Sequence, residues 1–290
     1  MKVKKGIILA GGLGSRLYPL TLASNKHLLP IYDKPVIYYP LTTLMLAGIR
    51  EILIISSPRD LPYIKTLLGK GDSIGVRFEY AIQEKPNGLP EAFILGEKFI
   101  ANQPVAMILG DNFFYGHGLS KVVFNAAQNF SGVHLFTYTV DNPETYGIIT
   151  LDDNQKVLSL EEKPKDSKSN IAVTGFYYFD GTVSSRSKNL LPSSRKELEI
   201  IDLIKSYMCD DHVTLTQLGR GCVWIDTGTP KSLLDASQYV EVIQARQGHF
   251  IACIEEVAWR MGFIDQKHFE NLINTMPPST YKQYLSKLFQ

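Results

Sequence analysis

The 290-residue sequence contains little cysteine, little histidine and no long apolar run. Its cysteines, Cys209, Cys222 and Cys253, are widely separated, form no CxxC pair and are odd in number, so we expect reduced thiols, as is usual in a cytoplasm. The six histidines are equally scattered, which makes a zinc site unexpected.

Charge and hydropathy exclude further classes of protein. The formal net charge of +1 gives no reason to expect a nucleic-acid binder, which usually carries a basic stripe. No apolar run approaches the roughly 18 residues of a membrane span. The N-terminus enters a strand-like run without the regions of a signal peptide. We therefore expect a cytoplasmic protein with small-molecule ligands and neither nucleic acid nor membrane as a partner.

The first half of the chain alternates short β-branched runs with segments of helical periodicity. Near-continuous apolar strands separated by helices are typical of a parallel sheet covered on both faces. Such a sheet binds ligands at the carboxyl ends of its strands. The expected strands are KGIILA (5–10), EILIISS (51–57), VRFEYAI (76–82) and VAMILG (105–110), and helical segments are expected at 38–47 and 91–100.

After Val133 the pattern changes to strands with little helix between them. VHLFTYTV, GIITLD, VLSLEEK and AVTGFYYF predict added strands beside the ligand, and HVTLTQL and CVWID predict two more that close the core. Helical periodicity returns near Glu199. We expect a Rossmann-like α/β fold, with a mostly parallel mixed sheet flanked by helices.

The last part of the chain is predicted to be helical. Thr229 suits an N-cap position, with Pro230 in the first turn. Apolar residues then recur at three- and four-residue steps and form one apolar face. We expect a core over residues 1–228 and a C-terminal helical extension over 229–290 that covers the sheet, with a subunit contact as the alternative. The apolar face comprises Leu233, Ala236, Val240 and Ile243.

Three glycines, Gly11, Gly12 and Gly14, follow the first strand within four residues. Glycine permits positive φ and close backbone approach, so successive N–H groups can converge on phosphate oxygens. No Gly-Lys-Ser/Thr of the Walker pattern follows, and Leu17 stands where the dinucleotide fingerprint needs a third glycine. The hypothesis that the chain is an NAD-dependent dehydrogenase therefore loses its main support. From the glycines alone, a tight turn without ligand remains the alternative.

Two basic residues, Arg16 and Lys26, follow the glycines. Arginine offers a planar fork to phosphate oxygens, and lysine a compact mobile charge. Two solvated surface charges are the alternative, but the apolar neighbours of Lys26 in HLLPIY argue against an exposed basic patch. Together with the glycines, the two residues indicate a cradle for a triphosphate.

Two aspartates, Asp111 in MILGDNFF and Asp226 in VWIDTGT, come directly after apolar runs. Mg²⁺ in phosphate-transfer sites takes one or two carboxylates plus phosphate oxygens and water. Each aspartate could instead cap a turn, so the residues leave both interpretations open.

The segment AIQEKPNGLPEA (81–92) follows the third strand. The amide of Gln83 both donates and accepts, which matches the N3–H and O4 edge of thymine or uracil. Gly88 would let the backbone approach the base. An ordinary polar loop is the alternative.

The stretch LAGGLGSRLYPLT (9–21) followed by a lysine resembles the signature of the sugar-nucleotidyltransferases, the nucleoside-diphosphate-sugar pyrophosphorylases. The resemblance extends through YDKPVIYYPL, LMLAGIREILIIS, ILGDNFFYGHGL, ELEIIDLIKSY, VWIDTGTPKSLLDASQYV and ARQGHFIACIEEVAWRMGFID, which cover most of the chain. It is strongest with short members that join dTTP and glucose 1-phosphate to give dTDP-glucose and pyrophosphate. That Mg²⁺-dependent reaction is the first step of dTDP-deoxysugar synthesis, such as that of dTDP-L-rhamnose.

Two alternatives to this activity stay open. A UTP-using sugar-1-phosphate uridylyltransferase is the nearer, because Gln83 would accept uracil as well as thymine. A non-catalytic regulatory relative is the other, and it would be expected to lack one of the charged residues that the resemblance makes catalytic. All five are present: Arg16, Lys26, Lys163, Asp111 and Asp226.

The resemblance also implies binding roles, position by position. Asp111 and Asp226 would hold Mg²⁺. Trp224 would form an apolar wall of the sugar pocket. Glu162 and Lys163 would bind the sugar phosphate, although their segment EEKPKDSK (161–168) could equally be a solvated hairpin. The nucleotide would be bound by Leu9, Gly11, Gly12, Gly14, Ser15, Arg16, Lys26, Gln83, Gly88 and Asp111. The sugar phosphate would be bound by Tyr146, Gly147, Glu162, Lys163, Val173 and Trp224.

The resemblance further implies a homotetramer with a second, regulatory nucleotide site. The matching positions for that site are Tyr115, Gly116, Arg220, Glu256 and Arg260. The chain departs from the family at four points. Pro90 and Glu91 replace alanine and glutamine in Gly-Leu-Ala-Gln-Ala, His27 replaces the glutamine after the lysine, and Phe250 replaces a lysine. The carboxylate at 91 is expected to alter nucleotide affinity or the preference between deoxyribose and ribose. The lost charge at 250 argues against strong feedback inhibition.

Overall fold

The computed structural model describes residues 2–288. The four apolar runs of the first half are all strands and pair in parallel in the order β6-β1-β4-β5. The register places Leu9, Ile55 and Leu109 side by side, so these strands end at a common carboxyl edge. Their bounds are β1 (Lys5–Leu9), β4 (Glu51–Ser56), β5 (Arg77–Ile82) and β6 (Val105–Leu109).

The strands expected after Val133 extend this sheet on one side. β11 (Ile171–Phe179) is antiparallel to β6 and also pairs with β8 and β9, so it joins the parallel half to the added strands. The result is a mixed nine-stranded sheet, as predicted. The other added strands are β8 (Val133–Thr139), β9 (Gly147–Leu151), β10 (Val157–Glu162) and β12 (Val213–Gln217).

Two short ribbons lie outside the main sheet. β7 (Asn112–Gly116) pairs antiparallel with β13 (Cys222–Asp226), and β2 (Pro30–Ile31) pairs with β3 (Lys34–Pro35). CVWID therefore pairs outside the main sheet, with a strand that the sequence did not predict. The ribbon places Asp226 opposite Asn112, one residue from Asp111, and so brings the two aspartate segments together.

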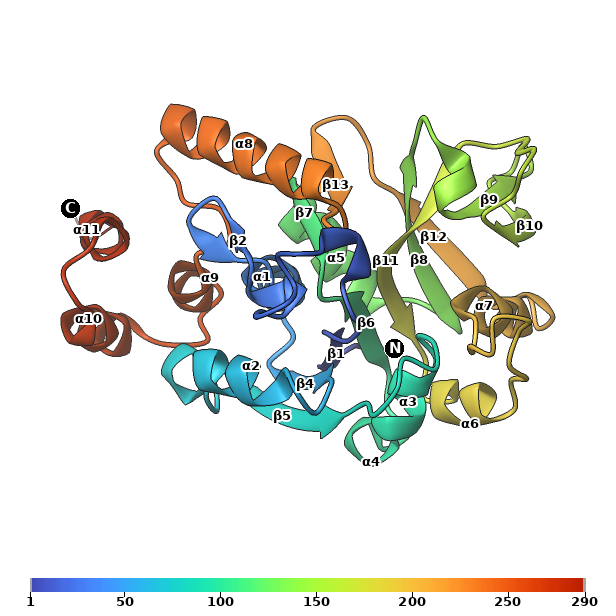
Figure 1. Ribbon diagram of the computed structural model, residues 1–290, viewed down its shortest axis with the longest axis horizontal. Helices are drawn as coiled ribbons and strands as arrows, with labels where there is room; N and C mark the ends of the chain where they lie inside the picture. Colours follow the sequence, from blue (N-terminus) through green and yellow to red (C-terminus); the bar gives the residue numbers. More distant parts are fainter. Residues whose placement is uncertain (1, 289–290) are drawn as a thin grey trace.

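Helices cover both faces of the sheet (Figure 1). Alternate residues of β1 divide between two buried clusters, with Ile8 facing α1, α2 and α5 and Ile7 facing α3, α4, α6 and α7. The helix expected over 91–100 is broken at Gly96, where a Cβ would lie 2.9 Å from the Ala92 carbonyl oxygen. The helices are α1 (Tyr38–Leu46), α2 (Leu61–Leu68), α3 (Glu91–Leu95), α4 (Glu97–Ile100), α5 (Leu119–Gln128), α6 (Val183–Lys188) and α7 (Ile200–Met208), with short 3-10 turns η1 (Ser15–Leu17), η2 (Lys26–Leu28), η3 (Asp72–Ile74) and η4 (Pro143–Thr145).

The C-terminal segment is helical, as predicted. Thr229 is the N-cap of α8 (Pro230–Gln247) and forms a capping box with Ser232. α8 packs on β2 and β13, and α9 (Ile254–Arg260) packs on α1, so the tail covers a helix and the short ribbons rather than the main sheet. α10 (Gln266–Thr275) and α11 (Thr280–Lys287) follow beyond α9, at the left of Figure 1. The division at residue 228 stays a prediction.

Within residues 2–288, no helix combines the length and the apolar character that crossing a bilayer requires.

Candidate active site

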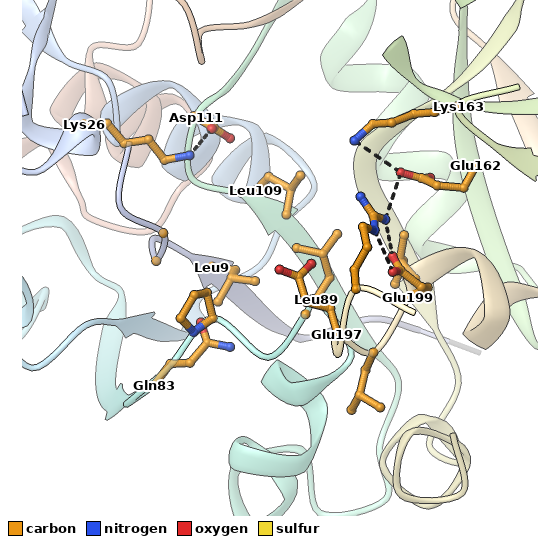
Figure 2. Close-up of a pocket in the computed structure, with 17 residues that line it drawn as sticks. Leu9, Lys26, Gln83, Leu89, Leu109, Asp111, Glu162, Lys163, Glu197 and Glu199 are labelled. Atoms are coloured by element: carbon orange, nitrogen blue, oxygen red, sulfur yellow. Dashed lines mark hydrogen bonds and ion pairs between the residues drawn. The ribbon is translucent and has the colours of Figure 1, made fainter. Parts of the chain in front are cut away.

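A cleft with two adjoining cavities, of about 310 and 230 Å³, lies at the carboxyl edge of the parallel strands. Figure 2 shows the larger cavity, with Lys26 and Asp111 on one wall, Lys163 and Glu162 on the opposite wall and Gln83 at one end. The cavities share Leu89, Leu109, Asp111, Glu162, Lys163 and Ile200. The larger is also lined by Leu9, Gly11, Gly12, Lys26, Gln83 and Gly88, and the smaller by Arg16, Tyr146, Gly147, Val173, Trp224 and Asp226.

The glycine loop reaches the cleft through its first two glycines. Gly12 and Gly14 have φ values of 90° and 60°, which other residues adopt only under strain. Gly11 has no such φ, but a Cβ there would lie 2.9 Å from Gln83 Oε1. Gly14 and Ser15 lie outside the linings of both cavities, although Arg16, the second residue of η1, lines the smaller one.

Lys26 and Asp111 form a largely buried ion pair on one wall of the cleft. Lys26 is the first residue of η2, and its Nζ donates to Asp111 Oδ2. The main chain of Asp111 is held by Thr227, whose backbone N–H and hydroxyl both donate to its carbonyl oxygen, at 3.0 and 2.8 Å. Burial alone would raise the pKa of Asp111, but the Lys26 charge acting together with the hydrogen bonds from Lys26 and Asn112 outweighs burial and holds that pKa well below its usual range. Asp111 is therefore ionised.

Asp226 lies at the end of β13, and its pKa is shifted in the opposite direction. Its Oδ1 accepts from the Gly228 N–H at 3.0 Å, and Arg16 approaches its Oδ2 at 3.6 Å. Burial, and after it the negative charge of Asp111, raises the pKa of Asp226. The two carboxylates repel each other, so a cation bound between them would relieve an unfavourable interaction.

His27 is buried beneath the residue that precedes Asp111. A Cβ on Gly110 would lie 2.7 Å from His27 Cδ2, and His27 Nδ1 is 2.5 Å from Asn25 Oδ1. His27 Nε2 is buried and has no hydrogen-bond partner among residues 2–288. Burial, and after it the Lys26 charge, lowers the pKa of His27 to about 3. This residue therefore supports the Lys26–Asp111 region as a neutral imidazole.

Replacing His27 with glutamine is expected to make the stability less sensitive to acid. Below pH 6.5 the unfolded chain protonates this histidine while the folded chain, with its pKa of about 3, does not. The wild-type protein therefore loses up to about 1.4 kcal/mol of unfolding free energy per pH unit between pH 6.5 and 3 through this group. Urea unfolding at pH 7, 5.5 and 4.5 measures the slope. His268→Gln, an exposed change on α10, is the control, and equal slopes in His27→Gln and wild type would contradict the prediction.

The opposite wall contains the predicted sugar-side residues. Lys163 has a φ of 48°, and its N–H donates to the Tyr146 carbonyl oxygen at 2.9 Å. Its Nζ lies 3.6 Å from Glu162 Oε1. A Cβ on Gly147 would lie 2.8 Å from Ile201 Cδ1, so glycine lets Ile201 pack closely against this corner. The rings of Tyr146 and Trp224 lie 5.1 Å apart, and both line the smaller cavity.

Sequence reasoning missed several residues of the cleft. Asn112 Oδ1 accepts from Trp224 Nε1 at 2.6 Å and from the Gly175 N–H at 3.1 Å, while its Nδ2 donates to Asp111 Oδ1 at 3.3 Å. Its position directly after Asp111 was an available signal. The segment RKELE offered only its charges, which are equally typical of a solvent-exposed loop. Its cavity-lining residues are Arg195, Glu197 and Glu199, and Arg195 contacts Glu199 at 2.7 Å and Glu162 at 3.6 Å.

Gly88 lines the cavity as expected, but the structure gives it a further requirement. Its φ is 106°, and a Cβ there would lie 2.0 Å from the Leu198 carbonyl oxygen. Gly88 therefore lets two loops pack together, whatever the ligand.

The predicted regulatory residues lie away from both cavities. Tyr115 and Gly116 are on β7, and Arg220 is exposed just before β13. Glu256 and Arg260 pair on α9, with Arg260 Nε 2.6 Å from Glu256 Oε1. Phe250, where relatives often carry lysine, stacks on Tyr284 at 4.0 Å. The second nucleotide site stays a prediction.

Comparison with known proteins places this chain and its fold in one class. The model of the nucleotidyl transferase family matches residues 5–242, and the chain belongs to that family. It is 48% identical over 286 residues to the glucose-1-phosphate thymidylyltransferase of Neisseria meningitidis serogroup A, covering 99% of each chain. It is 46% identical over 288 residues to the glucose-1-phosphate thymidylyltransferase of Xanthomonas campestris pv. campestris, covering 99% of this chain and 98% of the relative. These relatives confirm the resemblance to sugar-nucleotidyltransferases.

Solved structures agree. A Bacillus anthracis protein with a provisional assignment as a glucose-1-phosphate thymidylyltransferase, solved in complex with sucrose, superposes with a TM-score of 0.74 and 40% identity. The match covers 81% of this chain and 94% of that chain. A UDP-glucose pyrophosphorylase complexed with UDP-glucose superposes with a TM-score of 0.73 at 24% identity, over 83% of this chain and 99% of that one, and supports the fold alone. The predicted Rossmann-like α/β fold is confirmed.

Proposed function

We propose that this protein joins dTTP and glucose 1-phosphate to give dTDP-glucose and pyrophosphate, the first step of dTDP-deoxysugar synthesis. The observation that carries the proposal is the placement of Lys26 and Lys163 on opposite walls of one cleft (Figure 2). Two walls with one ammonium group each suit two substrates that both bear phosphate. Near-full-length identity of 48% to an enzyme of this name supports the choice of substrates.

The reaction needs no protein nucleophile. A phosphate oxygen of glucose 1-phosphate is already an anion, and it attacks the α-phosphorus of dTTP in line. The bond from the α-phosphorus to the bridging oxygen breaks, and pyrophosphate leaves with that electron pair. The protein positions two anions that repel each other and neutralises the charge that develops. Arg16, Lys26 and the N–H groups of the glycine loop hold the triphosphate, and Lys163 holds the incoming phosphate.

We infer that Asp111 and Asp226 hold Mg²⁺. The raised pKa of Asp226 and its repulsion by Asp111 fit a cation between them. Residues 2–288 contain no group of three or more histidine, cysteine, aspartate or glutamate side chains suited to a metal, so phosphate oxygens and water would complete the coordination. Bound there, Mg²⁺ would supply Lewis-acid polarisation of phosphate oxygens.

Base recognition, assembly and location complete the proposal. Gln83 reads the N3–H edge of thymine, an edge that uracil shares, so UTP is the competing nucleotide. We also propose a homotetramer, as implied by the resemblance, and a cytoplasmic reaction, where nucleoside triphosphates are available.

Pyrophosphate release with Mg²⁺ tests the proposal. The assay crosses dTTP, UTP, CTP, ATP and GTP with the 1-phosphates of glucose, galactose and N-acetylglucosamine. We expect the fastest release with dTTP and glucose 1-phosphate. Faster release with UTP would reassign the enzyme as a uridylyltransferase. No release from folded protein with any pair would refute catalysis and favour a regulatory relative.

Replacing Lys163 with alanine is expected to impair use of the sugar phosphate selectively. The Lys163 side chain lies on the sugar side and is half exposed, and its Nζ forms an ion pair with Glu162 at 3.6 Å. Loss of one charge-assisted donor should raise KM for glucose 1-phosphate roughly tenfold to a hundredfold and lower kcat. Calorimetry should show dTTP binding within about threefold of wild type. Equal losses for both substrates would contradict the assignment of Lys163 to the sugar side.

A further inference from the structure

Gln83, the proposed base reader, is held from behind by a carboxylate. Glu91, the first residue of α3, accepts a hydrogen bond at 2.7 Å from Gln83 Nε2. Its other oxygen accepts from Asn87 Nδ2, also at 2.7 Å. Glu91 lies outside the linings of both cavities of the cleft, but it contacts Gln83, which lines the larger one.

This hydrogen bond fixes which end of the Gln83 amide faces Glu91. An ionised carboxylate only accepts hydrogen bonds, so it can hold the amide nitrogen but repels the amide oxygen. A flipped amide would place two acceptors against each other, and Gln83 is only 6% exposed, so water has little access to separate them. Bonds from neutral donors to a charged acceptor are also stronger than neutral pairs.

The other end of the amide is thereby presented to the glycine loop. Gln83 Oε1 lies so close to Gly11 that a Cβ there would be 2.9 Å away. Both residues line the larger cavity. Gln83 therefore offers a fixed acceptor, Oε1, together with the second hydrogen of Nε2.

We propose that Glu91 is a positioning residue that sets base specificity by fixing the orientation of the Gln83 amide. A fixed acceptor suits thymine and uracil, which carry a hydrogen on N3, and disfavours cytosine, whose N3 is itself an acceptor. The inference rests on the proposed function, because it assumes that Gln83 meets the pyrimidine of a nucleoside triphosphate. It concerns the base rather than the sugar of the nucleotide.

A change of one atom at position 91 separates this role from others. Glu91→Gln keeps the shape of the side chain but offers both a donor and an acceptor, so either orientation of the Gln83 amide finds a partner. The flipped amide can donate to N3 of cytosine. Glu91→Ala removes the partner altogether. Glu84→Gln is the matched control, since it removes the same charge from an exposed residue next to Gln83.

The experiment measures kcat/KM for dTTP, UTP and dCTP with glucose 1-phosphate, and Kd for dTTP and dCTP by calorimetry without sugar. In Glu91→Gln and Glu91→Ala we expect the dTTP-to-dCTP ratio to fall roughly tenfold or more in both quantities, as the loss of one base contact would cause. Glu84→Gln should keep the wild-type ratio, and the Tm of Glu91→Gln should stay at the wild-type value.

The outcomes separate this inference from the proposed function. A wild-type ratio in Glu91→Gln, equal loss with both nucleotides, or a wild-type protein that does not discriminate dTTP from dCTP would each overturn the role of Glu91. A wild-type protein that binds dTTP but releases no pyrophosphate would instead refute the proposed function. In that case the binding ratios alone decide the role of Glu91, whether or not Glu91→Ala folds.

Discussion

Replacing Lys26 with methionine is expected to lower kcat/KM for dTTP roughly 10²–10³-fold, the usual cost of removing one preorganised donor from a site where charge develops. Lys26 Nζ is paired with Asp111 in a site where the two side chains are 17% and 10% exposed. Water therefore replaces the lost ammonium poorly, and the charge that builds on the triphosphate stays unbalanced.

Methionine preserves the apolar stem of the lysine, so the change tests the charge rather than the packing. It also leaves the Asp111 carboxylate buried without its cation, and we expect the free energy of unfolding at pH 7 to fall by roughly 3 kcal/mol. Lys163→Met is the matched control for stability, because Lys163 is half exposed and 3.6 Å from its carboxylate. Pyrophosphate release and urea unfolding measure the two effects. Turnover within about fivefold of wild type would contradict the role of Lys26.

Local features explain why so much of the fold was predictable from the sequence. The apolar runs that form β1 and β4 alternate with segments of helical periodicity. A strand that is buried on both faces appears in the sequence as a short apolar run, whichever strands it pairs with. The helix start at Thr229 and Pro230 likewise depends on a capping preference within a few residues. The glycine loop could be placed next to a ligand because it directly follows a predicted strand.

Features that depend on distant pairing were not predictable from residue patterns. The partner of CVWID is β7, more than a hundred residues earlier, and this pairing brings Asp226 to Asp111. The requirement for glycine at 88 comes from Leu198, which lies far along the chain. Arg195 lies in a charged segment that is typical of a solvent-exposed loop. Only the tertiary structure places it in the cleft.

The roles of Glu91 and His27 were only partly predictable from the sequence. Both could be singled out in the sequence as departures from a family pattern, but the physical effect of each depends on a neighbour that only the structure reveals. For Glu91 this neighbour is the amide of Gln83, eight residues away across a loop. For His27 it is the main chain at Gly110. A local pattern identifies an unusual residue, and packing determines what the residue does.

Isosteric amides at the two aspartates are expected to have opposite effects on stability and the same effect on catalysis. Asp226→Asn removes a carboxylate whose pKa is raised by burial and by Asp111. A carboxyl group whose pKa is raised in the folded state stabilises the fold at low pH. It loses that contribution as the pH rises above the pKa that the group has in the unfolded chain. At pH 7 without Mg²⁺, the asparagine should therefore raise the free energy of unfolding.

Asp111→Asn should lower the free energy of unfolding at pH 7, because the pKa of Asp111 is held low by Lys26 and its ionised form stabilises the fold. Removing it leaves Lys26 buried without a counter-ion, at a cost of roughly 3 kcal/mol. Both variants should lose at least about a hundredfold in pyrophosphate release and bind Mg²⁺ more weakly in calorimetric titrations with dTTP present, because each would lose a ligand charge. A site selected only for stability would not retain a repelled carboxylate at 226. If Asp226→Asn proved less stable than wild type yet kept its Mg²⁺ affinity, Asp226 would be a structural residue and the metal would have to be held elsewhere.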